Sequence, residues 1–156
     1  MKDRLAQLRI IAEKEGLDGL IISSRPNTFY FTGFTGTTSK YLITKENAYL
    51  VVDFRYTSQA KSQVFAGIEV IELETDVNDS LNTLCLHHGV ESLGIEGEDM
   101  TFAGYQTLRE SLKEVKTVKD VQASLNKVRL IKDSEEIALI QKAVDIADNA
   151  FQEILP

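Results

Sequence analysis

The sequence has few of the residues that mark extracellular, membrane or redox proteins. Cys85 is the only cysteine in 156 residues, so an intrachain disulfide is excluded and we expect a reducing compartment. No apolar run approaches the roughly 18 residues that a membrane-spanning helix needs. The first stretch, MKDRLAQLRIIAEKEG, interrupts its apolar residues with charges and lacks the apolar core of a secretory signal. These absences predict a cytoplasmic protein.

Basic residues are also scarce. The chain has 17 Lys and Arg residues against 24 Asp and Glu, a formal net charge of −7. Because no basic cluster is present to neutralise phosphates, neither nucleic acid nor an anionic membrane surface is expected as a partner. Hydrophobic residues make up 43% of the chain, which predicts a packed domain rather than disorder.

Common catalytic motifs are missing as well: the sequence contains no HExxH, GxSxG, GxGxxG or GK[ST]. His87 and His88 are the only histidines, and adjacent helical residues point about 100° apart, so one metal ion does not suit both. We interpret them as helix-capping or solvent-facing residues, with a metal site as the alternative. Cys85 lies in an apolar helical pattern, which favours an inert core thiol over a nucleophile.

Two groups of charged residues follow predicted strands. Glu96, Glu98 and Asp99 form a cluster in which paired carboxylates offer acid–base chemistry, although a loop end leading into a helix is the favoured interpretation. Asp53 and Arg55 suit either a ligand or, as we favour, a helix N-cap with a local ion pair. The residues alone therefore indicate no self-sufficient active site.

Hydrophobic periodicity predicts alternating helices and strands. Predicted helices cover 2–15, 27–32, 54–65, 77–88, 101–113, 121–127 and 133–155, with Asp53, Asp76, Thr101 and Asp133 as N-caps. Predicted strands cover 18–23, two segments of a hairpin within 39–53, and 68–73, 92–96 and 114–120. This order predicts a three-layer α/β fold with a mixed, mostly parallel sheet, helices on both faces and a long C-terminal helix.

The last predicted helix has more apolar surface than one small domain covers. One apolar face repeats at steps of three and four, and a second lies beside it: Ile137, Ile140, Val144, Ala147, Phe151 and Ile154, with Leu139, Ala143, Ile146 and Ala150. A second copy or a further domain is needed to bury both. We therefore divide the chain into an α/β domain, 1–128, and a linker with a helix from an incomplete second domain, 129–156.

Four stretches carry a resemblance to a known family. They are RPNTFYFTGFTGTTSKYLIT at 25–44, VVDFRYTSQA at 51–60, SLGIEGEDMTFAGYQTL at 92–108, and the segment from Asn126 onward that includes VRLIKDSEEI. In this order they resemble the N-terminal domain of the creatinase/prolidase/aminopeptidase P family of pita-bread metallopeptidases. The resemblance spans nearly the whole chain.

The resemblance implies the activity of a longer protein. Family members hydrolyse the peptide bond before proline with two divalent metal ions (Mn, Co or Zn), bound by a catalytic domain that follows the N-terminal one. This chain is then the non-catalytic N-terminal domain of an Xaa-Pro dipeptidase or aminopeptidase, inactive alone, with no catalytic residue, metal or cofactor of its own. The implied partners are a second copy, forming a homodimer, and short Xaa-Pro peptides for the longer protein.

The resemblance also implies roles for individual residues. In the family, a loop after the FTG block leans over the partner subunit's active site and narrows its entrance. That loop matches Phe34, Thr35, Gly36, Thr37, Thr38, Ser39 and Lys40. Structural motif positions match Asn27, Tyr30, Gly33, Asp53, Arg55 and Tyr56, and we expect the aromatics of 27–31 to pack into the core. Thr37 and Thr38 depart from the family's usual Gly-Ser pattern.

Two other functions stay open. The chain suits a stand-alone module that binds a small molecule or a protein through residues 26–39, and it also suits a pure dimerisation unit. The DNA past codon 156 separates the first of these from the peptidase interpretation. An immediate stop codon supports the module, whereas an open frame that encodes Asp, His and Glu ligands supports the peptidase.

Overall fold

A six-stranded sheet organises the computed structural model, which describes residues 3–74 and 76–155. Its strands are β1 (Gly19–Ile22), β2 (Lys40–Thr44), β3 (Ala48–Val52), β4 (Glu69–Glu72), β5 (Ser92–Ile95) and β6 (Thr117–Asp120). The helices are α1 (Arg4–Glu15), α2 (Arg25–Thr32), α3 (Thr57–Gln63), α4 (Val77–His87), α5 (Phe102–Ser111), α6 (Gln122–Leu130) and α7 (Ser134–Ile154). Every predicted element is present, in the predicted order.

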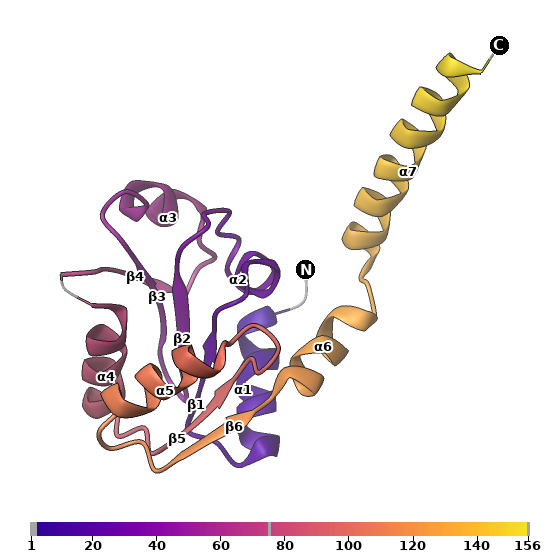
Figure 1. Ribbon diagram of the computed structural model, residues 1–156. Helices are drawn as coiled ribbons and strands as arrows, with labels where there is room; N and C mark the ends of the chain where they lie inside the picture. Colours follow the sequence, from indigo (N-terminus) through magenta and orange to yellow (C-terminus); the bar gives the residue numbers. More distant parts are fainter. Residues whose placement is uncertain (1–2, 75, 156) are drawn as a thin grey trace.

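The sheet is mixed and mostly parallel, as predicted. Its strand order is β4-β3-β2-β1-β5-β6. The hairpin strand β2 pairs antiparallel with both β1 and β3, while the β1–β5, β3–β4 and β5–β6 pairs are parallel. Because β1 and β5 are parallel neighbours, their carboxyl ends meet at one edge of the sheet, together with the start of β2 (Figure 1).

Side chains of the central strands alternate between two buried faces. On β1, Leu20 and Ile22 pack with α1, α3 and α6, whereas Ile21 packs with α4 and α5 on the opposite face. The strands β2 and β3 alternate in the same way because successive side chains of a strand point to opposite faces. The sheet therefore lies between two helical layers (Figure 1), which confirms the three-layer fold.

Three of the predicted helix caps are confirmed, and one is wrong. Asp76 and Thr101 accept backbone N–H groups at the starts of α4 and α5, and Asp133 forms a capping box with Glu136. Asp53 caps no helix, because α3 begins only at Thr57, after Tyr56 as N-cap. Its carboxylate instead accepts from the backbone N–H of Arg55 at 3.0 Å and from the Arg55 guanidinium at 2.8 Å. This local pair holds a turn where the sequence predicted a helix over 54–65.

The C-terminal helix α7 projects away from the rest of the chain (Figure 1). None of its residues is buried, and its apolar side chains are widely exposed: Ile137, Leu139, Ile140, Val144, Ile146, Phe151 and Ile154. Within the described residues no helix is both long and apolar enough to cross a membrane. The predicted division between residues 128 and 129 lies in the last turn of α6, which ends at Leu130.

Candidate functional site

The FTG stretch forms α2 and the loop that follows it. Ser24 caps α2, Pro26 lies in its first turn, and the helix ends at Gly33, whose φ is 81°. A Cβ at Gly33 would lie 2.9 Å from the carbonyl oxygen of Gln63, so both the backbone angle and the close packing require glycine. The helix starts two residues earlier than predicted.

Only part of the aromatic stretch packs as predicted. Phe31 is buried, but Phe29 is 53% exposed, so the expectation that these aromatics all enter the core is wrong for Phe29. The two side chains are separated by two positions on α2 and therefore point to different sides of the helix. Tyr30 is partly buried. The guanidinium carbon of Arg4 lies over its ring, 4.1 Å from the ring centroid.

The loop over residues 34–40 is anchored at both ends. Phe34 is fully buried and meets the Tyr56 ring edge-on at 5.8 Å, and Gly36 packs so closely against Phe34 that a Cβ there would collide with its ring. Lys40 is already the first residue of β2. Three threonines are exposed between these anchors: Thr35, Thr37 and Thr38. The surface that the loop can present to another molecule is therefore narrower than the seven residues of the sequence prediction.

Hydrogen bonds tie this exposed segment to α3 and to Tyr56. The Thr35 backbone N–H donates to Gln63 Oε1 at 2.9 Å, and the hydroxyls of Thr37 and Tyr56 share a 2.7 Å hydrogen bond. The motif residue Tyr56 thus supports the loop directly, while Gly33 ends the helix before it. Asp53 and Arg55 contribute only the adjoining turn.

A buried carboxylate fixes the start of α2. Glu96 follows β5 and has no exposed surface. It accepts the backbone N–H groups of Ser23 at 2.5 Å and Ser24 at 2.7 Å, the Ser24 hydroxyl at 2.7 Å and the Asn27 amide at 2.5 Å. An anion at a helix N-terminus is favoured by the helix dipole and by the unpaired N–H groups. Glu96 is therefore a positioning residue, which agrees with the structural interpretation favoured from the sequence.

The Glu96 network extends to the end of the α/β unit. Asn27 accepts a 2.9 Å hydrogen bond from the Arg129 guanidinium on α6, while its amide binds Glu96. The β5 end, α2 and α6 are thereby joined through three side chains. The sequence analysis identified Asn27 as a motif position but did not predict its contact with Arg129, because the two residues are 102 positions apart.

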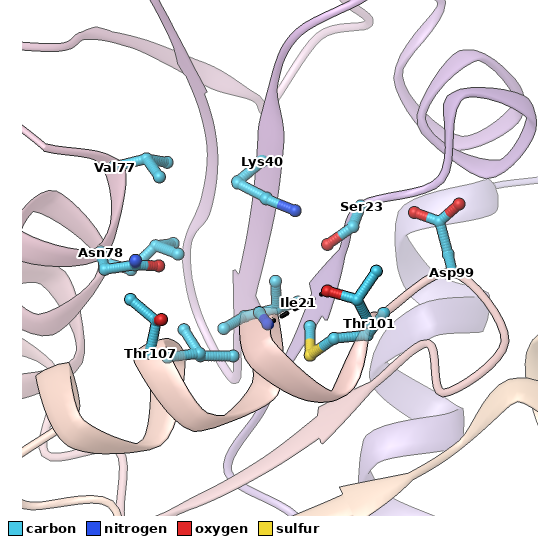
Figure 2. Close-up of a pocket in the computed structure, with 12 residues that line it drawn as sticks. Ile21, Ser23, Lys40, Val77, Asn78, Asp99, Thr101 and Thr107 are labelled. Atoms are coloured by element: carbon cyan, nitrogen blue, oxygen red, sulfur yellow. Dashed lines mark hydrogen bonds between the residues drawn. The ribbon is translucent and has the colours of Figure 1, made fainter.

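A cavity of about 330 Å³ opens beside this network (Figure 2). It is lined by the end of β1 and the start of β2, by the first two turns of α4 and α5, and by the loop between β5 and α5. Its polar residues are Ser23, Lys40, Asn78, Asp99, Thr101 and Thr107, and its apolar floor includes Ile21, Leu81 and Leu108. Clefts at the carboxyl ends of strands in open α/β sheets are common ligand sites.

Two opposite charges face this cavity. Burial lowers the pKa of Lys40, against the opposing effect of the Asp99 and Glu96 carboxylates. Partial burial and the Glu96 carboxylate raise the pKa of Asp99, while Lys40 lowers it.

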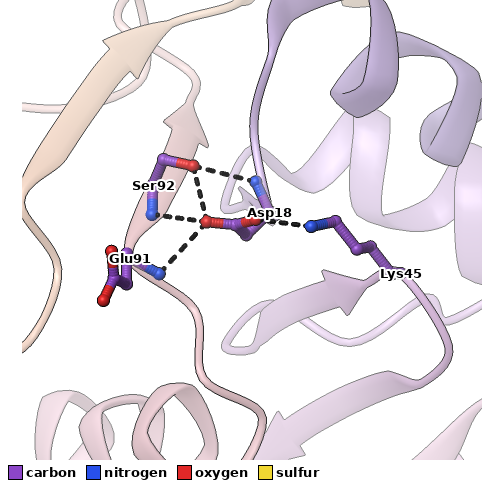
Figure 3. Close-up of polar contacts among 4 residues, drawn as sticks. All are labelled: Asp18, Lys45, Glu91 and Ser92. Atoms are coloured by element: carbon purple, nitrogen blue, oxygen red, sulfur yellow. Dashed lines mark hydrogen bonds and ion pairs between the residues drawn. The ribbon is translucent and has the colours of Figure 1, made fainter.

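The opposite edge of the sheet has a polar cluster with a structural role (Figure 3). Asp18 accepts from Lys45 Nζ at 2.6 Å, from the Ser92 hydroxyl at 2.8 Å and from two backbone N–H groups. The Lys45 ammonium, followed by the Ser92 hydroxyl and the Glu91 N–H, lowers the pKa of Asp18 to about 2, in spite of burial. These bonds link the β2–β3 turn to the starts of β1 and β5.

The other candidate residues of the sequence have structural environments. Cys85 is buried in the core, as predicted, and burial raises the pKa of its thiol to about 12, which disfavours the reactive thiolate. His88 follows the end of α4, and its ring nitrogen lies 2.8 Å from the Tyr49 hydroxyl. Across residues 3–74 and 76–155, no three His, Cys, Asp or Glu side chains come together as a metal site.

A family model described as the creatinase/prolidase N-terminal domain matches residues 4–131. Among curated proteins, the chain is 38% identical over 152 residues to "Uncharacterized peptidase YqhT" of Bacillus subtilis, covering 97% of this chain and 42% of that protein. It is 29% identical to an Xaa-Pro dipeptidase of Pyrococcus horikoshii, covering 96% of this chain and 41% of the relative. The chain thus spans about two-fifths of the length of these curated relatives.

Solved structures agree with these matches. An Xaa-Pro dipeptidase from Bacillus anthracis superposes with a TM-score of 0.91 at 30% identity, over 97% of this chain and 42% of the other. The N-terminal domain of the cytoplasmic peptidase PepQ from Mycobacterium tuberculosis superposes with a TM-score of 0.73 at 29% identity, over 83% of this chain and 100% of the other. The second match is a domain of this kind crystallised by itself.

Proposed function

The chain belongs to the creatinase/prolidase N-terminal domain family, and from this premise we propose that it is the non-catalytic N-terminal domain of a longer Xaa-Pro dipeptidase or aminopeptidase. The observation that carries the proposal is the small share of each relative's length that this chain covers. The alignment includes 96% of this chain but only 41% of a relative named an Xaa-Pro dipeptidase. The rest of such a protein is then the part that holds two divalent metal ions and hydrolyses the bond before proline.

The exposed face of α7 supports this proposal. Ile140 is 50% exposed, Phe151 58% and Ile154 76%, on a helix that contacts little of its own chain. Apolar patches of this kind normally mark a surface that another part of the protein covers. We assign residues 129–156 to the linker and first helix of the catalytic domain, which then buries this face.

The loop between Phe34 and Lys40 is proposed to act across a homodimer. Its exposed threonines lie on a rigid base formed by Phe34, Tyr56 and Gln63. A rigid loop that leans over the active site of a second subunit would restrict the length of peptide admitted without taking part in the chemistry. We also propose a cytoplasmic location, for which the single buried Cys85 is suited.

Enlarging the loop tests the gating role in the longer protein. Thr38→Trp is expected to lower kcat/KM for a pentapeptide with proline in second position by about tenfold more than for an Xaa-Pro dipeptide, because a bulky ring narrows the entrance. Thr83→Trp, which adds the same side chain at an exposed position on α4, serves as the control. Steady-state kinetics on both peptides measure the difference.

An equal effect of Thr38→Trp on both peptides would rule out selection by length. Sedimentation of the longer protein at several concentrations checks the dimer independently. A protein that stays monomeric while it remains active and length-selective would contradict gating by the partner subunit.

A further inference from the structure

The cavity beside Lys40 has the features of a small-molecule site, and these features are independent of the proposed peptidase function. At about 330 Å³ it lies at the lower end of the range of ligand pockets, about 300–1,000 Å³. It is formed by five separate elements rather than by one surface loop. Its lining combines an apolar floor with several polar side chains, as in most pockets for small metabolites.

Three polar side chains of the cavity lack partners, whereas Thr101 and Thr107 bind backbone groups of α5. Across the parts of the chain that the structure describes, residues 3–74 and 76–155, neither the Lys40 nor the Asp99 side chain has a hydrogen-bond or ion-pair partner. The Ser23 hydroxyl oxygen is fully buried and also has no partner within this described part. In Figure 2, the Lys40 side chain extends toward Ser23, and Asp99 lies on the other side of Ser23. A buried polar group without a partner is costly, so the Ser23 hydroxyl is suited to a ligand atom, while Lys40 and the exposed Asp99 offer unpaired charges beside it.

The charges limit the chemistry of such a ligand. A simple anion near Lys40 would meet repulsion from the Asp99 and Glu96 carboxylates, which both act on Lys40. A simple cation near Asp99 would meet repulsion from Lys40. A molecule that carries both charges meets an opposite charge at each group, since its carboxylate can face Lys40 and its ammonium can face Asp99.

We propose that this cavity binds a free α-amino acid with an aliphatic side chain, as its zwitterion. The carboxylate pairs with Lys40 and the Ser23 hydroxyl, near the N-terminus of α5, which favours negative charge. The ammonium pairs with Asp99 at the rim. The aliphatic side chain packs on the floor that Ile21, Leu81 and Leu108 provide.

Titration of the 156-residue chain tests this site, because a domain of this kind crystallises alone. L-Leucine is compared with 4-methylpentanoate, which lacks the ammonium, and with 3-methylbutylamine, which lacks the carboxylate. Amide NMR shifts near Ser23, Lys40 and Thr101 report the position, and their saturation gives Kd. Leucine is expected to bind at least about tenfold more tightly than either analogue, because each removes a charge-assisted contact.

Two substitutions test the assignment of the charges. Lys40→Met and Asp99→Asn are each expected to weaken leucine binding by about tenfold or more, while the melting temperature changes little because neither side chain has a partner to lose. Lys61→Met, on the exposed surface of α3, is the control and should leave Kd unchanged.

Three results would overturn the proposal. They are the absence of saturable shifts with leucine at millimolar concentrations, binding of 4-methylpentanoate as tight as that of leucine, and leucine binding that survives Lys40→Met. Each of these readouts is a binding constant of this chain, so none depends on whether the longer protein is a peptidase.

Discussion

Replacing Glu96 with alanine is expected to lower the free energy of unfolding by about 3–5 kcal/mol. The carboxylate is fully buried and accepts four hydrogen bonds from Ser23, Ser24 and Asn27. Its removal leaves these donors unpaired inside the protein and opens a void. It also frees Asn27, through which Arg129 holds α6. A loss of this size is a large fraction of a typical domain stability of about 5–15 kcal/mol.

Glu98→Ala is the matched control, because Glu98 lies two positions away on the exposed surface. Its effect should stay within about 0.5 kcal/mol. Urea unfolding followed by circular dichroism measures both variants, and the slope against urea concentration checks that the unfolding stays two-state. Equal stability of the two variants would show that the Glu96 network does not hold α2.

Replacing Phe34 with alanine is expected to cost about 3–5 kcal/mol, the range for deleting a buried phenylalanine ring. Phe34 has no exposed surface, its ring meets the Tyr56 ring edge-on, and Gly36 packs directly against it. The substitution therefore removes both core packing and the base of the loop. Hydrogen exchange at residues 35–39 should become faster than the loss of global stability accounts for, because the loop loses its anchor.

Phe54→Ala removes the same ring from a position that is 74% exposed, on the turn before α3. We expect it to change stability by less than about 0.5 kcal/mol. Thermal and urea unfolding compare the two alanine variants directly. A similar cost for both would mean that Phe34 is not a core residue and that the loop is not fixed at its base.

The fold was predictable because its signals are local. Helices at 77–87 and 102–111 begin at Asp76 and Thr101, whose side chains accept backbone N–H groups within the next turn. Strands at 40–44 and 48–52 are separated by three polar residues, which favours a hairpin. The one wrong prediction of a cap was Asp53. An aspartate before a predicted helix is a good N-cap candidate, but its carboxylate binds the Arg55 guanidinium instead.

The candidate site was less predictable because it depends on contacts between distant segments. Glu96 was identified as one of three carboxylates after a strand, but only the fold brings it to Ser23 and Ser24, more than 70 positions away. The cavity joins Lys40 with Asp99, and the sequence placed these residues in a loop and in a separate acidic cluster. Phe34 was assigned to the gating loop as a whole, and nothing in this glycine-rich stretch indicated that its ring is buried.

Peptidase assays on two proteins test most directly whether this chain is a non-catalytic N-terminal domain. They are the 156-residue chain and the longer protein from the same open reading frame, assayed with Mn²⁺ on Leu-Pro and on a longer peptide with proline in second position. We expect the longer protein to accelerate hydrolysis by about a million-fold or more and to lose activity when a chelator removes its metal ions. The 156-residue chain should show no turnover. Turnover by that chain, or an open frame that stops at codon 156, would contradict the account.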